Sequence, residues 1–230
     1  MKLKILSLLL AVGALVSACG DDDNGSGPEN AGRIRFVLLS PDAPDLDVLV
    51  DNVEVATNVP YLTEPEYLEF EAGTRNIQVR VSGSDEIVLD EDVTVVDGLD
   101  YSALLGNQFA AIDLAFLTDE NTPASGSSAK VRLIHAAPSA GLVDIYVTAP
   151  GADLTQETPL FTAVDFGDFS PYGPVPAGEY QLRITSVGTT DVLIDSGTIE
   201  LSSGQVRTGI AVEAPGGGEP FDALVLEDLN

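Results

Sequence analysis

The chain contains one segment twice, and this repeat restricts the folds that the sequence can adopt. Residues 33–50 (RIRFVLLSPDAPDLDVLV) align without a gap with residues 130–147 (KVRLIHAAPSAGLVDIYV), at an offset of 130 − 33 = 97 positions. Further along, the dipeptide Ala-Gly at 72–73 matches the same dipeptide at 177–178, at an offset of 177 − 72 = 105. A repeat on this scale indicates two copies of one structural unit of roughly one hundred residues.

Strand signals dominate both copies. β-Branched residues alternate with polar residues between clusters of Gly, Pro, Asn and Asp, and no segment shows an apolar face with helical periodicity. The predicted strands are 33–40, 46–51, 67–71, 75–82, 86–96, 100–106 and 112–117 in the first copy, and 130–137, 143–149, 169–175, 179–186, 191–201, 206–213 and 221–227 in the second. We therefore predict an all-β fold of two tandem immunoglobulin-like β-sandwich domains, each with about seven strands. The likeness to immunoglobulins is architectural, since their cysteine pair and core tryptophan are absent from the sequence.

The expected domain boundaries follow from changes in composition. Residues 1–18 are predicted to be a lipoprotein signal peptide and 19–32 a flexible acidic tether. The first sandwich is expected at 33–118 and the second at 130–230, with a polar linker at 119–129 between them.

The N-terminal segment indicates export. Lys2 and Lys4 precede an apolar run at 5–16, whose length of about 18 Å is short of the roughly 30 Å that a membrane helix must span. A cleaved secretory signal explains this pattern better than a membrane span. The segment at 15–19 (LVSAC) resembles the bacterial lipobox, and the resemblance implies that Cys19 becomes a lipid-modified N-terminus.

The residues after Cys19 bear on where the protein is anchored. Gly20 stands where an aspartate would resemble an inner-membrane retention signal, so we expect attachment to the outer membrane. The run Asp21–Asp23 is similar to the acidic export tags of some surface lipoproteins, although such runs are more often solvated linker. Both the surface and the periplasmic location stay open.

The strong negative charge excludes one class of partner and raises the question of a metal. The sequence carries a net charge of −27, which makes nucleic acid an unsuitable ligand. Asp42, Asp45 and Asp47 lie close together in one connection and are candidate calcium ligands, because calcium takes six to eight oxygen atoms. No D-x-[DN]-x-[DN]-G loop is present, and acidic surfaces also keep exported domains soluble, so no cofactor is predicted.

Strand alternation predicts which side chains face the core. Ile34, Phe36 and Leu38 share one face of the opening strand, which leaves Arg35 on the other face. If Pro41 centres a hairpin, Arg35 lies opposite Asp47, and the same arithmetic places Arg132 opposite Asp144. We expect both pairs to be cross-strand ion pairs on the outer face, each contributing about 0.2–1 kcal/mol.

Few residues in the chain suit catalysis. His135, the only histidine, falls on the core face where the first copy has a leucine, so a buried structural role is expected rather than a general base. The S-x-x-K match at 127–130 lies in a linker and lacks its companion motifs. The sequence also lacks a nucleophile elbow, a phosphate-binding loop and a metal-type histidine pair. No catalytic residue is therefore predicted.

An aromatic run in the second copy is the best candidate for binding. It consists of Phe161, Phe166, Phe169 and Tyr172 in a connection rich in Gly and Pro. Exposed aromatic rings of this kind stack on a glycan or contact a partner protein. The alternative is that they cap the sandwich core, and Phe169→Ala separates the two: loss of stability supports capping, and a folded but inactive protein supports binding.

Several motifs resemble a known family. The segments at 132–140 (RLIHAAPSA), 35–44 (RFVLLSPDAP) and 170–180 (SPYGPVPAGEY) are similar to the bacterial domain of unknown function number 4397. The resemblance covers both repeats and implies a secreted or lipid-anchored location, with no activity attached. The first copy departs from the pattern at Leu38 and Arg75, where the second has His135 and Tyr180.

These observations predict a non-enzymatic, lipid-anchored protein of the cell envelope that acts as a binding or adhesion module for a protein or glycan. Alternatives are a structural spacer without a dedicated ligand, a calcium-dependent glycan binder, and an envelope hydrolase that uses paired carboxylates about 5–9.5 Å apart. No spacing in the sequence singles out such a carboxylate pair.

Overall fold

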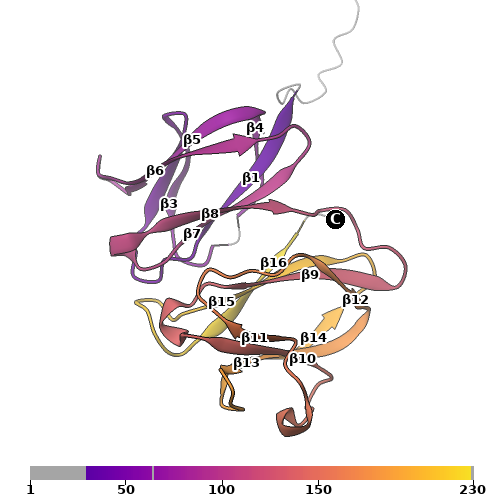
Figure 1. Ribbon diagram of the computed structural model, residues 1–230. Coiled ribbons are helices and arrows are strands. Elements are labelled where there is room, and N and C mark those ends of the chain that lie inside the picture. Colours follow the sequence, from indigo (N-terminus) through magenta and orange to yellow (C-terminus); the bar gives the residue numbers. More distant parts are fainter. Residues whose placement is uncertain (1–29, 64, 229–230) are drawn as a thin grey trace, which may run out of the picture.

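The computed structural model describes residues 30–63 and 65–228, and apart from three short 3-10 turns the regular secondary structure of these residues consists of strands (Figure 1). The predicted signal peptide, nearly all of the tether and the lipidation site Cys19 lie outside the described residues. Within the described ranges, no helix is both long and apolar enough to cross a bilayer.

The first domain consists of two four-stranded sheets. One sheet has the order β4–β1–β7–β8 and the other has the order β3–β2–β5–β6. The strands are β1 (Ala31–Leu38), β2 (Leu46–Val50), β3 (Val53–Val59), β4 (Leu68–Glu71), β5 (Gly73–Val81), β6 (Ile87–Val95), β7 (Asp100–Gly106) and β8 (Asp113–Asp119). A short 3-10 turn, η1 (Phe109–Ala111), connects the last two strands.

The second domain repeats this architecture. Its sheets have the orders β12–β9–β15–β16 and β11–β10–β13–β14. The strands are β9 (Ser128–His135), β10 (Val143–Thr148), β11 (Phe161–Val164), β12 (Gly173–Pro176), β13 (Gly178–Ser186), β14 (Val192–Leu201), β15 (Val206–Val212) and β16 (Asp222–Glu227). Two 3-10 turns, η2 (Pro138–Ala140) and η3 (Leu154–Gln156), lie in its connections.

The predicted all-β fold of two tandem sandwiches is confirmed, with one strand more in each domain than expected. The strands missing from the prediction are β3 and β11. They occupy equivalent edge positions in the two domains, β3 beside β2 and β11 beside β10. Both are largely exposed, so they lack the apolar alternation that reveals a half-buried strand. Asn58 in β3 and Ala163 in β11 have positive φ, which marks the irregular pairing of these edges.

The two domains have separate cores and a third apolar cluster between them. In the first domain Ile34, Phe36 and Leu38 face the core, as the alternation predicts. The third cluster brings together residues of both domains: Val37, Leu39, Leu104 and Leu117 from the first, and Ile134, Ala136, Ile210, Val212 and Leu226 from the second. The sheets β4–β1–β7–β8 and β12–β9–β15–β16 therefore pack against each other through their outer faces (Figure 1).

This packing shows that the predicted surface ion pairs are wrong. Strands β1 and β2 belong to different sheets, so Arg35 does not lie opposite Asp47, and both side chains are buried. Asp47 instead accepts hydrogen bonds from the backbone N–H of Asn58 (3.0 Å) and the hydroxyl of Ser82 (2.6 Å), and contacts Arg80 (3.2 Å).

The second domain contradicts the other predicted pair, Arg132–Asp144, in the same way. Asp144 accepts hydrogen bonds from the backbone N–H groups of Ala163 (2.9 Å) and Gly188 (2.8 Å). Asp47 and Asp144 thus share one role: each binds the backbone of the irregular residue in the neighbouring edge strand.

Candidate functional site

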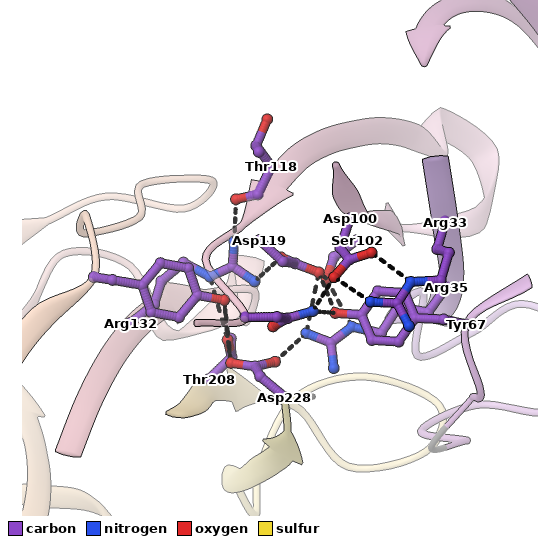
Figure 2. Close-up of polar contacts among 12 residues, drawn as sticks. Arg33, Arg35, Tyr67, Asp100, Ser102, Thr118, Asp119, Arg132, Thr208 and Asp228 are labelled. Atoms are coloured by element: carbon purple, nitrogen blue, oxygen red, sulfur yellow. Dashed lines mark hydrogen bonds and ion pairs between the residues drawn. The ribbon is translucent and has the colours of Figure 1, made fainter. Parts of the chain in front are cut away.

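Two arginines and two aspartates meet at the buried contact between the domains (Figure 2). Arg35 of β1 donates from Nε to Ser102 Oγ (2.8 Å), and its Nη2 contacts Asp228 and lies 3.4 Å from Asp119 Oδ2. Arg132 of β9 donates from Nη2 to Asp119 Oδ1 (2.6 Å). Each arginine thus forms an ion pair with an aspartate of the other domain: Arg132 with Asp119, the last residue of β8, and Arg35 with Asp228, the residue that follows β16.

Two tyrosines complete this group, which we call the interdomain network. The Arg35 guanidinium lies 4.9 Å from the centre of the Tyr67 ring, and that of Arg132 lies 4.6 Å from the centre of the Tyr172 ring. The Tyr67 hydroxyl donates to Asp119 (2.5 Å) and the Tyr172 hydroxyl to Asp228 (3.1 Å). Burial raises the pKa of both tyrosine hydroxyls, so they remain protonated donors.

The charges of the interdomain network balance. Arg35 and Arg132 are each 2% exposed, and the carboxylates of Asp119 and Asp228 are fully buried. Burial acts to lower the pKa of the Arg35 guanidinium, but Asp119 and Asp228 raise it above its ordinary value, so the arginine stays charged. Because both carboxylates are bound by arginines and neither lines any of the cavities described below, the network joins the domains and does not resemble a hydrolytic carboxylate pair.

A cavity of about 300 Å³ lies between the two sheets of the second domain. Its lining comes from every strand of the domain and is mostly aliphatic, including Leu133, Val175, Leu182 and Val225. Leu160 and Phe161 lie at its margin and are 58% and 36% exposed, so the cavity opens near the edge strand β11. We call it the intersheet cavity.

The strand registers explain why the second domain has this cavity. Four positions that line it correspond, by their pairing partners, to aromatic residues in the first domain: Leu133 to Phe36, Val175 to Phe70, Arg207 to Tyr101 and Val225 to Phe116. In the first domain these rings form two contacts, Phe36 with Phe70 at 6.2 Å and Tyr101 with Phe116 at 4.6 Å. The smaller or more flexible side chains of the second domain leave this space empty.

A groove of about 460 Å³ adjoins the intersheet cavity on the surface. The two share Leu133, Leu160, Phe161, Ser170 and Pro171 as a common wall. The rest of the groove is a mixture of apolar and polar side chains that includes Thr162, Asp168 and Phe169. We call it the aromatic groove, because Phe161 and the 55% exposed Phe169 line it.

The four aromatic residues singled out in the sequence lie in three places. Phe161 and Phe169 line the aromatic groove, and Phe169 is too exposed to cap the core. Phe166 and Phe169 both border a cavity of about 80 Å³ between the domains, and Tyr172 belongs to the interdomain network. The structure thus divides the run into an exposed pair and a half-buried pair.

The other predicted residues have structural surroundings. His135 is buried, as expected; its Nε2 lies 3.0 Å from the carbonyl oxygen of Gly141, and its Nδ1 accepts from the N–H of Ala137 (3.4 Å). Asp42 accepts a hydrogen bond from the backbone of Phe109 (2.7 Å). Across residues 30–63 and 65–228, no three His, Cys, Asp or Glu side chains come together to hold a metal ion, and this includes the calcium candidates Asp42, Asp45 and Asp47.

The sequence analysis did not single out Asp119, which lies in the predicted linker, or Asp228, which follows the last predicted strand. A signal was present, because Val37 and Leu39 extend the apolar run of β1 onto the face that carries Arg35. A strand that is apolar on both faces is buried on both faces.

Comparisons with solved structures give distant similarities. An α-glucan-binding streptococcal virulence factor is 11% identical with a TM-score of 0.28, covering 87% of this chain and 97% of its own. A family 26 carbohydrate-binding module from Eubacterium rectale is 10% identical with a TM-score of 0.26, covering 87% and 98%. The Bacillus anthracis TIE protein is 10% identical with a TM-score of 0.24, covering 81% and 34%. At these scores the ligand must be argued from the chain's own residues.

No curated protein matches the chain. The family model for the domain of unknown function DUF4397 matches residues 32–146 and 147–230, which together span nearly all of the described residues. The two matched segments agree with two tandem copies, as the motifs of the repeats suggest. The chain therefore belongs to the DUF4397 family.

Proposed function

We propose that this protein is a non-enzymatic, lipid-anchored binding protein of the cell envelope, and that its second domain binds the sugar rings of a glycan in the aromatic groove. The observation that carries the proposal is the exposure of Phe161 and Phe169 on the wall of one groove. Exposed aromatic rings are costly in water and suit the apolar faces of a ligand.

The polar side chains of the groove support a sugar ligand. Thr162 and Asp168 line the groove together with the two phenylalanines and bring a hydroxyl and a carboxylate group to it. A sugar ring offers an apolar face for stacking and hydroxyl groups for hydrogen bonding, so it matches this mixture. The first domain has Ala56 at the position of Phe161, as the strand registers show, and therefore lacks that ring.

Calorimetric titration with maltoheptaose, cellohexaose and chitohexaose tests the proposal. We expect binding of at least one oligosaccharide, reduced at least tenfold by Phe169→Ala and by Phe161→Ala, with both variants folded. The matched control is Leu142→Ala, which removes an exposed apolar side chain that lines neither the cavity nor the groove. Absence of binding to all three sugars, or equal loss in the control, contradicts the glycan proposal.

Two further measurements address the anchor and calcium. Incorporation of labelled palmitate should depend on Cys19, and protease treatment of intact cells distinguishes a surface location from a periplasmic one. We expect a calcium chelator to leave binding unchanged, because Asp47 is bound by Arg80 and Asp42 by the backbone of Phe109.

A further inference from the structure

We infer that the ligand of the second domain is an amphiphile, whose alkyl chain enters the intersheet cavity while its polar head lies in the aromatic groove. This inference rests on the proposed function, because it assigns the groove to the head. It adds a second site and a ligand class that a soluble glycan does not satisfy.

The chemistry of the intersheet cavity selects an apolar chain. Among its lining residues only Glu200 and Arg207 are charged, and Arg207 Nη2 lies 3.3 Å from Glu227. The Tyr180 hydroxyl donates to the carbonyl oxygen of Pro176 (2.9 Å), and Ser170 Oγ accepts from the N–H of Leu133 (3.0 Å). A polar ligand that entered the cavity would thus lose its hydrogen bonds with water and find few free groups to replace them. An alkyl chain makes no such hydrogen bonds and therefore has none to lose.

The size of the intersheet cavity sets the length of the chain. A cavity of about 150 Å³ lined by apolar side chains is known to bind benzene, which has six carbon atoms. A volume of about 300 Å³ is twice as large, so it suits an alkyl chain of about a dozen carbon atoms.

The position of the opening gives the chain a route from the groove. Strands β11 and β12 are the edges of different sheets, and both contribute to the lining. Four residues both line the cavity and are exposed to solvent, and they mark its opening. They are Leu160 and Phe161 on the β11 side and Pro171 and Pro174 on the β12 side. Since the aromatic groove shares Leu160, Phe161 and Pro171, a ligand that bridges both sites leaves its head on the surface.

The first domain supplies the design of the test. Val175→Phe and Val225→Phe each place in the second domain the aromatic residue that the first domain has at the same position. These variants fill the intersheet cavity and leave the residues of the aromatic groove unchanged, since neither valine lines it. The full chain carries Cys19→Ser in every measurement, so that no acyl chain attached to this residue competes.

The probe is N-phenyl-1-naphthylamine, whose fluorescence rises in apolar surroundings, displaced by octyl, decyl and dodecyl maltosides below their micelle concentrations. We expect the affinity of the maltosides to rise about fourfold for each added methylene, until the chain exceeds about a dozen carbons. We expect Val175→Phe and Val225→Phe to weaken probe binding at least tenfold, with folding checked by circular dichroism and thermal unfolding.

The results separate this inference from the proposed function. Probe binding that both filled variants leave intact, or maltoside affinity that does not depend on chain length, overturns the inference even when oligosaccharides bind. If both phenylalanine variants misfold, Arg207→Tyr repeats the test with a third aromatic residue of the first domain's core, since Arg207 corresponds to Tyr101 and does not line the groove. Phe169→Ala should reduce oligosaccharide binding while probe binding persists, and probe binding with no oligosaccharide binding contradicts only the glycan assignment.

Discussion

The two domains share a strand order but use the space between their sheets differently. The first domain fills it with Phe36, Phe70, Tyr101 and Phe116, and the second leaves the intersheet cavity at the same positions. The outer faces differ much less, because both domains place an arginine, a hydroxyl side chain, a tyrosine and an aspartate there. The contact between the copies has therefore been kept, while their interiors have diverged.

The divergence gives the domains different roles in the proposed function. A closely packed core suits a support, because every side chain has fixed neighbours. An open core suits a ligand, because apolar surface remains to be covered. The interdomain network joins the two domains, so the first domain holds the ligand-binding domain in a fixed orientation.

The largest expected effect concerns the way the domains share the network. Both arginines of the network contact Asp119, but of these two only Arg35 contacts Asp228, so the two aspartates are not equivalent. Asp119→Asn leaves buried arginine charge without its partner and should lower the free energy of unfolding by about 3–5 kcal/mol. Chemical denaturation measures this, and the domains are expected to unfold in separate steps once the contact is weakened.

The control for that variant is Glu120→Gln. Glu120 follows Asp119 directly and lies 3.6 Å from Lys130 Nζ, and its side chain is 61% exposed. Its loss should cost no more than about 1 kcal/mol. Equal losses for the two variants would show that the buried network is not what joins the domains.

A medium effect is expected when the first domain is given the core of the second. Phe36→Leu together with Phe70→Val removes the ring contact at 6.2 Å and opens space between the sheets. The double variant should lose about 2–3 kcal/mol of stability. It should also gain a second binding site for N-phenyl-1-naphthylamine, measured as a doubled stoichiometry. A stoichiometry of one in a folded double variant would mean that the aromatic residues do not account for the difference between the cores.

The smallest expected effect concerns the pH dependence of stability at Asp47, whose surroundings differ from those of its counterpart Asp144 in the second domain. Hydrogen bonds from the Ser82 hydroxyl and the Asn58 N–H, and then the contact with Arg80, lower the pKa of Asp47 below its ordinary value. A carboxylate with a lowered pKa stabilises the folded state above the unfolded-state pKa of about 3.9, and this contribution is lost as the pH falls through the folded-state value. Asp47→Asn should thus cost about 1 kcal/mol at pH 7 and less below pH 4, measured by urea unfolding at both values.

The companion variant is Arg80→Thr, since the strand registers place Thr185 at this position in the second domain. This variant removes the contact that contributes less to the lowered pKa of Asp47, and it leaves the hydrogen bonds from Ser82 and Asn58 to Asp47 in place. Most of the pH dependence should survive. If Arg80→Thr abolishes it, the arginine and not the hydrogen bonds controls the titration of Asp47.

Much of the fold could be predicted from the sequence, because apolar alternation reports a strand with one buried face. The same rule missed β3 and β11, which bury little, and misplaced Arg35, whose strand is buried on both faces. The pairing of Arg35 with Asp228 joins residues 193 positions apart, and no local pattern reports such a contact.

The candidate site was only partly visible in the sequence. Phe161 and Phe169 belong to the aromatic run that was singled out, but nothing in that run separates them from Phe166 and Tyr172. The intersheet cavity depends on the volumes of residues from four strands whose pairing the sequence does not specify. The gapless repeat alignment does set Phe36 against Leu133, which is the one trace of the cavity in the sequence alone.

The reciprocal exchange of arginine and aspartate between the domains also has a consequence for how the protein responds to dilution. Two separate subunits joined by such a self-complementary surface would come apart at low copy number, since their association depends on concentration. Here one polypeptide carries both surfaces. The short connection from Glu120 to Ser127 keeps the two domains close together, so each surface meets the other at a high effective concentration. A cell that makes few copies therefore still obtains the paired form.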